Sequence, residues 1–183
     1  GADKLALFSP AYKSLNLLDT LADNPPAERF TAFSAYAPNG NGQWVMGDWD
    51  GDGLKTPGVY AGGAFFFTNK SGESGVGDWS GFWIGIVGPP IAGRFTHTRP
   101  NDCIGAVEQS GSPAQYVFVL YYTCDLSGLA TPTISNQWLS SPLPTAGGHT
   151  GTYQFAAGDF NNDGLDSIAV RRGPYIAFGN TAP

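Results

Sequence analysis

A ten-residue segment rich in acidic residues and glycine occurs twice in the chain, at 47–56 and again at 158–167. In each copy, side chains that carry oxygen stand at alternate positions, and a glycine follows the third of them. These side chains are Asp48, Asp50 and Asp52 in the first copy, and Asp159, Asn161 and Asp163 in the second. Carboxylates this close repel one another unless a cation lies between them. The pattern is typical of a loop that wraps a hard cation such as calcium.

The residues after the glycine supply further candidate ligands. In such loops the seventh position contributes a backbone carbonyl, and the ninth can contribute a side-chain oxygen. The candidates at these positions are Leu54, Thr56, Leu165 and Ser167. An EF-hand would need a glutamate at position twelve, where this chain has Val59 and Val170. We therefore expect about two calcium sites that are not EF-hands.

Short segments rich in β-branched and aromatic residues flank both loops. Segments 43–46 and 154–157 lead into the loops, and segments 57–60 and 168–170 lead out of them. This composition is typical of strands. Each loop is therefore predicted to be the long turn of a β-hairpin, which a bound cation would pin.

Composition supports an all-β chain. Of 183 residues, 26 are glycine and 14 are proline, as expected for many short strands joined by tight turns. No segment predicts a helix longer than one or two turns, and the best candidate, 14–21, favours a strand. No apolar run approaches the length of about 18 residues that a membrane span requires. The net charge of −6 argues against binding to nucleic acid.

Two cysteines fall in a predicted hairpin. Segments 102–109 and 115–124 read as strands around a turn at 110–113. Folding the hairpin about this turn places Cys103 and Cys124 nearly opposite one another, where a cross-strand disulfide is geometrically possible. The alternative is a pair of buried thiols. A disulfide would predict an exported protein, either secreted or at the cell surface.

The loop anchors an internal repeat. Segment 93–102 is a degenerate third copy, predicted to bind no metal, and segment 1–8 aligns with 164–171 as a partial fourth copy. In the third copy Arg94 replaces the first carboxylate and Asp102 falls at position nine, so we hypothesise that an ion pair between them replaces the cation. The chain is predicted to be a single repeat domain, 1–183, with approximate repeats 1–42, 43–88, 89–150 and 151–183.

A full repeat has room for about four short strands, the content of a propeller blade. The four repeats are expected to supply three, four, four and three strands. Such a set does not close into a ring of complete blades. Either the chain is part of a larger propeller, or two chains combine as a homo-oligomer that completes the ring.

The loops and their outgoing strands carry a resemblance to a known family. Residues 47–53 followed by 57–60, and 158–164 followed by 166–170, resemble the FG-GAP/VCBS-type repeats of bacterial surface proteins, which are related to integrin α-subunit propeller repeats. The resemblance implies a β-propeller, or a partial one, of four-stranded antiparallel blades with calcium-binding hairpin loops. The family often has aspartate at position nine, from which Thr56 and Ser167 depart.

Most aromatic residues are expected in the core. Trp49 and Phe160 share the second loop position, where the resemblance implies packing between blades. Trp79, Trp83 and Trp138 lie in or near outer strands and turns, where a tryptophan can stack on a sugar ring, although a packing role is the more common one.

Catalytic chemistry is not favoured. The only histidines, His97 and His149, lie in polar turn segments, and no His/Cys cluster has transition-metal spacing. Close carboxylates can form a glycosidase pair, but here they lie inside the loops. The sequence predicts a noncatalytic binding module of a secreted or cell-surface protein that recognises a glycan or a protein, without membrane insertion. The alternatives are a structural unit with no ligand but calcium and part of a secreted polysaccharide-degrading enzyme.

Overall fold

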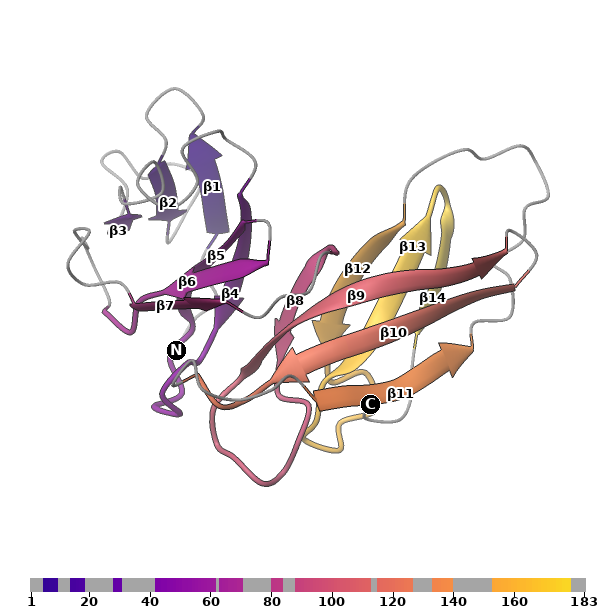
Figure 1. Ribbon diagram of the computed structural model, residues 1–183. Helices are drawn as coiled ribbons and strands as arrows, with labels where there is room; N and C mark the ends of the chain where they lie inside the picture. The colour runs from indigo at the N-terminus through magenta and orange to yellow at the C-terminus, as the bar shows by residue number, and fades with distance from the viewer. Residues whose placement is uncertain are drawn as a thin grey trace.

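A computed structural model describes residues 5–9, 14–18, 28–30, 42–61, 63–70, 80–83, 88–112, 115–126, 133–139 and 153–178. Within these residues all regular structure is β-strand, in four antiparallel sheets, so the all-β prediction is confirmed (Figure 1). Among the same residues there is no helix long and apolar enough to cross a membrane.

The strands form four consecutive sheets, which we call the first to the fourth. The first holds β1 (Leu5–Ser9), β2 (Ser14–Leu18) and β3 (Glu28–Phe30). The second holds β4 (Gln43–Gly47), β5 (Thr56–Ala61), β6 (Ala64–Phe67) and β7 (Ser80–Trp83). The third holds β8 (Pro90–Gly93), β9 (Cys103–Ser112), β10 (Gln115–Thr123) and β11 (Thr133–Leu139). The fourth holds β12 (Gln154–Gly158), β13 (Ser167–Arg172) and β14 (Tyr175–Phe178).

Each sheet is a simple meander whose strands pair in chain order, and the strand numbers of three, four, four and three match the prediction. The strand at 14–18 falls within segment 14–21, which the sequence assigns to a strand. The described strands do not close into a ring, because the first and fourth sheets lie at opposite ends of the molecule (Figure 1). The prediction of antiparallel four-stranded units therefore holds for the second and third sheets, without propeller closure.

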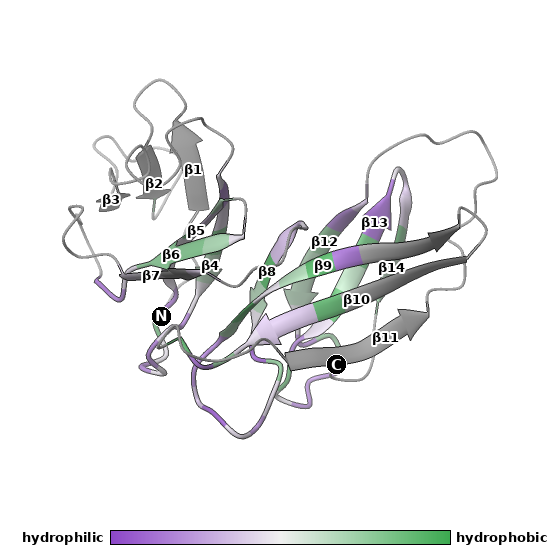
Figure 2. Ribbon diagram, viewed as in Figure 1, coloured by the Kyte–Doolittle hydropathy of each residue, from purple (hydrophilic) through white to green (hydrophobic). Residues whose placement is uncertain are grey.

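Side-chain alternation explains why these segments are strands. Burial alternates along β4, β6 and β8, as expected where only one face of a strand is covered. In contrast, Thr56 to Tyr60 of β5 and Ser167 to Val170 of β13 are buried at every position, and both strands lie between two other strands of their sheet. Figure 2 shows hydrophobic residues along the strands and hydrophilic ones in the turns.

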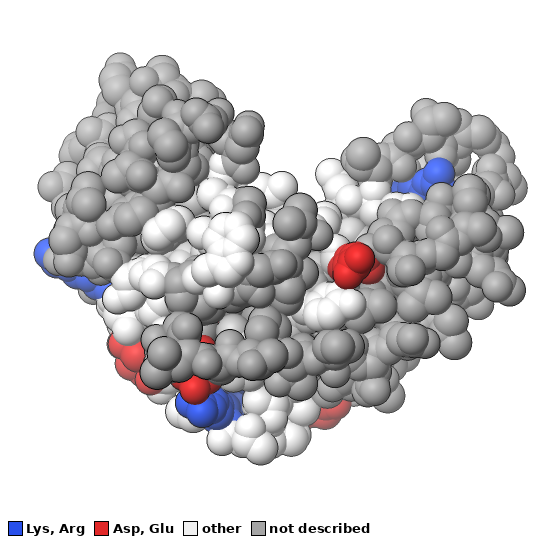
Figure 3. All heavy atoms as spheres, in the orientation of Figure 1, with Lys and Arg blue, Asp and Glu red and all other residues white. Residues whose placement is uncertain are grey.

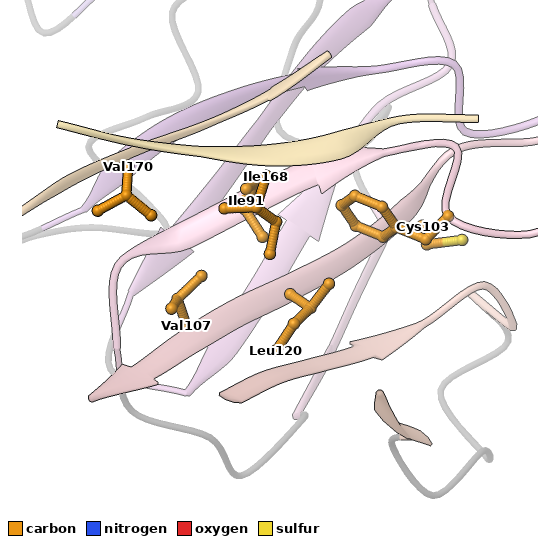
Figure 4. Packing of buried hydrophobic residues seen from close by; sticks show 7 residues of the cluster. Ile91, Cys103, Val107, Leu120, Ile168 and Val170 are labelled. Carbon is orange, nitrogen blue, oxygen red and sulfur yellow. The ribbon is translucent and has the colours of Figure 1, made fainter. Parts of the chain in front are cut away.

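Two apolar cores join neighbouring sheets. Between the second and third sheets, Trp49, Phe65 and Phe67 pack with Ile104 and Ala106 of β9. The other core lies between the third and fourth sheets, where side chains of β8, β9 and β10 meet those of β13 (Figure 4). Its labelled members are Ile91, Cys103, Val107, Leu120, Ile168 and Val170. Trp49 and Phe95, from the loops at 48–55 and 94–102, are members of these cores.

The predicted disulfide is present. Thr123 of β10 faces Ile104 of β9, so the next pair along the ladder is Cys124 and Cys103, and their sulfurs are bonded at 1.99 Å. The hairpin is longer than the sequence indicated, because β9 continues to Ser112 and pairs there with Gln115. Composition favours a turn for the glycine and serines at 110–112, but pairing with β10 holds them extended.

Candidate metal centre

The first loop connects β4 and β5 and brings three carboxylates together. One oxygen from each of Asp48, Asp50 and Asp52 lies within 4.8 Å of the others. Asp50 and Asp52 are exposed and Asp48 is partly buried. An acidic triad of this geometry can hold a metal ion, and its donors are all oxygen atoms.

Asp48 organises the turn through the backbone. Its Oδ1 accepts hydrogen bonds from the N–H groups of Gly51 and Asp52, at 2.7 and 3.1 Å, and its Oδ2 accepts one from Gly53 at 2.9 Å. Gly51 and Gly53 have φ values of 82° and 87°, a left-handed conformation that glycine adopts without steric cost. The glycines therefore let the chain curl around the Asp48 carboxylate and place the three acids on one side.

The second loop, between β12 and β13, repeats this arrangement. Asp159 accepts from the N–H groups of Asp163 at 3.0 Å and Gly164 at 2.9 Å, as Asp48 does in the first loop. Gly164 has a φ of 86°, and Asn162 stands in the left-handed conformation with a φ of 59°. The two loops thus share one backbone design although their sequences differ.

An amide stands in the second loop where the first has a carboxylate. The Asn161 Nδ2 donates to Asp163 Oδ2 at 2.8 Å. This hydrogen bond, followed in importance by the N–H of Leu165, lowers the pKa of Asp163 below its ordinary value. The hydrogen bond therefore favours the ionised form of Asp163, which is the form that ligates a metal ion.

The ninth-position residues are the first residues of the strands that leave the loops. Thr56 and Ser167 are buried, with exposed fractions of 6% and 1%. Within the described residues, the Ser167 hydroxyl is a buried polar group without a hydrogen-bond partner. At position seven, Leu54 is exposed and Leu165 is buried. Ligation by these four residues stays a prediction.

In both acidic loops, the aromatic ring at the second position packs against the glycine that precedes the loop. Trp49 is buried, and a Cβ atom added to Gly47 would lie 2.4 Å from its ring. The Trp49 indole N–H also donates to the Thr56 carbonyl at 3.0 Å, which ties the two ends of the loop. Phe160 stands in the same relation to Gly158, but 42% of it is exposed. The packing role predicted for Trp49 between sheets is confirmed by its contact partners.

The third loop differs from the others in length. Gly47 pairs with Thr56 and Gly158 with Ser167, whereas Gly93 pairs with Cys103, so the loop at 94–102 is one residue longer than those at 48–55 and 159–166. Asp102 therefore corresponds to Lys55 and Asp166, the residues just before the outgoing strands, and the assignment of Asp102 to position nine is wrong. Thr96 and Thr98 occupy the loop positions that hold candidate oxygen ligands in the other two loops. Their hydroxyls form a hydrogen bond of 3.0 Å with each other.

The hypothesised ion pair between Arg94 and Asp102 is also wrong. Asp102 Oδ2 accepts from the backbone N–H of Asp48 at 2.9 Å and lies 3.4 Å from the Lys55 ammonium. The reason is the extra loop residue, because it places Asp102 beside the second sheet rather than beside the start of its own loop.

Two carboxylates join neighbouring sheets through contacts that the sequence analysis does not predict. Asp102 donates its N–H to the Asp48 carbonyl at 2.6 Å and accepts from the Asp48 N–H. Asp166 does the same with Arg94, at 2.8 Å in both directions. Burial raises the pKa of Asp166, and the bond from the Arg94 N–H offsets part of this effect. The sequence signal for such a contact is an acidic residue directly before a strand in which apolar residues alternate.

The remaining candidates do not converge on one site. Trp83 on β7 is 68% exposed, and its ring lies over Gly63. Trp138 lies on β11, where its backbone pairs with Phe118 of β10. The structure does not describe the surroundings of its side chain. Trp79 and His149 lie outside the described residues, and His97 is exposed in the third loop.

Most of the acidic side chains visible in Figure 3 lie along the edge of the molecule that carries the loops, with basic side chains beside them. Comparison of the chain with models of protein families, with curated proteins and with solved structures finds no match.

Proposed function

We propose that this chain is a noncatalytic binding module of a secreted or cell-surface protein, built from propeller-type units whose hairpin loops are stabilised by calcium. The observation that carries the proposal is the acidic triad of Asp48, Asp50 and Asp52 on an exposed turn. The resemblance of both loops to FG-GAP/VCBS-type repeats supports the same conclusion.

The residues present fit a hard cation. The side chains at the alternate loop positions offer oxygen atoms, which calcium prefers, and neither loop contains the histidine or cysteine that transition metals favour. At the base of the second loop, the Ser167 hydroxyl has no hydrogen-bond partner among the described residues. Its oxygen is therefore available as a further metal ligand. A bound cation would supply positive charge between carboxylates that otherwise repel one another.

Calcium binding to the folded state must raise the midpoint of thermal unfolding. We expect the midpoint to rise across a calcium titration and to fall in EDTA. Asp50→Ala is the sharpest variant, because within the described part of the chain the Asp50 carboxylate accepts one long hydrogen bond, of 3.3 Å from the Asp52 N–H, and so contributes little without a metal. Glu108→Gln, which removes an exposed acid from β9, is the matched control.

The expected result is that Asp50→Ala loses part of the calcium response while its midpoint in EDTA equals that of the wild type. The variant Asp50→Ala/Asp163→Ala should lose the whole response. A midpoint that does not change with calcium in the wild type would contradict the metal half of the proposal.

The disulfide between Cys103 and Cys124 supports an exported protein, because disulfides persist in oxidising compartments. For the ligand, exposed Trp83 offers an aromatic surface to a sugar or to a protein side chain. A glycan-array signal that Trp83→Ala abolishes would support a glycan, and a signal that it leaves unchanged would exclude this tryptophan.

The second candidate is a structural or assembly unit with no ligand but calcium. It is favoured by the uncovered apolar face of the fourth sheet, where Ile176 and Phe178 are each 55% exposed. Turnover of an acidic polysaccharide would instead support part of a degrading enzyme.

A further inference from the structure

We propose that Asp102 is a positioning residue for the calcium site of the first loop. By holding the backbone of Asp48, Asp102 raises the affinity of the loop for calcium, and bound calcium in turn strengthens the contact between the second and third sheets. This inference rests on the proposed function, because it takes calcium as the ion that the first loop binds.

The side chain of Asp48 is the one around which the first loop folds. Its carboxylate accepts from the N–H groups of Gly51 at 2.7 Å and Gly53 at 2.9 Å. Asp48 is partly buried, whereas Asp50 and Asp52 are exposed. A change in the direction of the Asp48 side chain would therefore displace the turn and the acids that it carries.

Asp102 holds Asp48 on both sides of its α-carbon. The Asp102 carboxylate caps the Asp48 N–H, from which it accepts at 2.9 Å, and the Asp102 N–H donates to the Asp48 carbonyl at 2.6 Å. The two Asp48 groups belong to the two peptide units that flank its α-carbon, and each peptide unit is planar. Holding both planes fixes the backbone dihedral angles of Asp48 and, with them, the direction of its Cα–Cβ bond.

The segment that carries Asp102 is itself held in place. Asp102 is buried, and the next residue, Cys103, is bonded to Cys124 across the hairpin. The side-chain amide of Asn101 donates to the carbonyls of Asp102 at 2.9 Å and Cys124 at 3.1 Å. The contact therefore orders Asp48 before a cation arrives, which lowers the entropic cost of binding it.

The charge of Asp102 acts in the same direction as its hydrogen bonds. Lys55 belongs to the first loop, and its ammonium lies 3.4 Å from Asp102 Oδ2. A positive charge beside the loop disfavours a bound cation, and the Asp102 carboxylate offsets that charge. The test must therefore separate the hydrogen bond from the charge.

The same contact occurs elsewhere in this chain at a loop without an acidic triad. Asp166 accepts from the Arg94 N–H and donates its own N–H to the Arg94 carbonyl, both at 2.8 Å. Between Arg94 and Asp102 that loop has no acidic side chain. Removal of Asp166 therefore measures the loss of a sheet–sheet contact alone.

Calorimetric titration with calcium tests the proposal on the 183-residue chain that carries Asp163→Ala. This substitution removes an acid from the second loop, so that the first loop is the site measured. In this background, Asp102→Ala is expected to weaken calcium binding about tenfold, as is usual for loss of a group that orients a metal ligand. Asp166→Ala is the matched control, which should lower the unfolding midpoint in EDTA but leave the calcium affinity unchanged.

Two double variants in the same background separate the hydrogen bond from the charge. Asp102→Asn/Lys55→Met and Asp102→Ala/Lys55→Met both lack the ion pair and have the same net charge. Asparagine keeps an oxygen that can accept from the Asp48 N–H, so the first variant is expected to bind calcium more tightly. Equal affinities of the two would overturn the positioning role.

Failure of this inference differs from failure of the proposed function. If Asp102→Ala binds calcium as tightly as the Asp163→Ala parent, Asp102 is not a positioning residue although the loop is a calcium site. A parent that binds no calcium would contradict the calcium site itself, and this inference with it.

Hydrogen exchange gives a test that requires no substitution at Asp102. A contact that strengthens calcium binding must be strengthened by calcium to the same degree. In the Asp163→Ala chain, we expect calcium to slow exchange at the N–H groups of Asp48 and Asp102 and to leave exchange at the Asp166 N–H unchanged. Unchanged exchange at Asp48 and Asp102 in a chain that binds calcium would overturn the proposal.

Discussion

The carboxylate of Asp102 accepts a hydrogen bond of 2.9 Å from the backbone N–H of Asp48, 54 residues earlier and in another sheet. Asp48 is also the residue whose own carboxylate shapes the first loop. Asp48 therefore contacts the neighbouring sheet through its backbone and shapes the first loop through its side chain. Loop conformation and sheet packing are consequently coupled.

Asp102→Ala should lower the free energy of unfolding by about 1–3 kcal/mol, because it removes the carboxylate that pairs with the partly buried N–H of Asp48. Lys55→Met should change it by less than about 1 kcal/mol, because the ammonium is largely exposed and such ion pairs contribute little. Urea unfolding measures both. Equal losses in the two variants would show that the ion pair, and not the backbone cap, carries the effect.

Trp49→Ala should destabilise the protein by about 3–5 kcal/mol, because it empties the space between Phe65, Phe67 and Gly47. Phe160→Ala is the matched variant at the equivalent loop position, where the ring is 42% exposed and contacts Phe178. In a monomer, Phe160→Ala should lower the free energy of unfolding much less than Trp49→Ala does. Chemical denaturation of both at low protein concentration gives the comparison, and similar losses would contradict the assignment of Trp49 to a sheet–sheet core.

Gly53→Ala and Gly164→Ala should each cost about 1–2 kcal/mol, because both glycines have left-handed φ values and nothing lies within 4 Å of an added Cβ. The penalty is therefore conformational and not steric. Asparagine at the same positions should cost less than alanine, since asparagine tolerates this conformation, as Asn162 already does at a φ of 59°. Thermal denaturation in EDTA isolates this term from metal binding, and an asparagine penalty equal to that of alanine would contradict it.

Replacing both Cys103 and Cys124 by serine should lower stability by about 2–4 kcal/mol, the usual contribution of a disulfide of moderate loop length. A reducing agent should lower the unfolding midpoint of the wild type and leave that of the double variant unchanged. The opposite behaviour, a wild-type midpoint that does not respond to reductant, would mean that the bond does not constrain the unfolded chain.

Local patterns in the sequence predicted the strands that flank the two acidic loops and the loops themselves. Alternating oxygen side chains with glycine at a fixed place predicted the two acidic loops, because the backbone of such a turn is set within about ten residues. The cross-strand position of Cys103 and Cys124 was likewise predictable, because it depends only on the register of one hairpin.

Relations between sheets could not be predicted in the same way. One extra residue in the loop at 94–102 moves Asp102 from its expected partner Arg94 to Asp48 and Lys55, and an alignment without gaps hides that shift. The exposure of Phe160 compared with Trp49 depends on whether a neighbouring sheet covers it, and the loop motif is the same in both cases.

Asp102 and Asp166 each bind the backbone of the sheet that precedes their own in the sequence. In both cases the later sheet therefore supplies the group that stabilises the earlier one. During synthesis from the N-terminus, the loop at 48–55 emerges before the residue that secures its first N–H, and the loop at 94–102 likewise emerges before Asp166. The second and third sheets are therefore completed only when the next sheet has left the ribosome, and translation that stops before Asp102 or Asp166 leaves the N–H of Asp48 or Arg94 without its carboxylate partner.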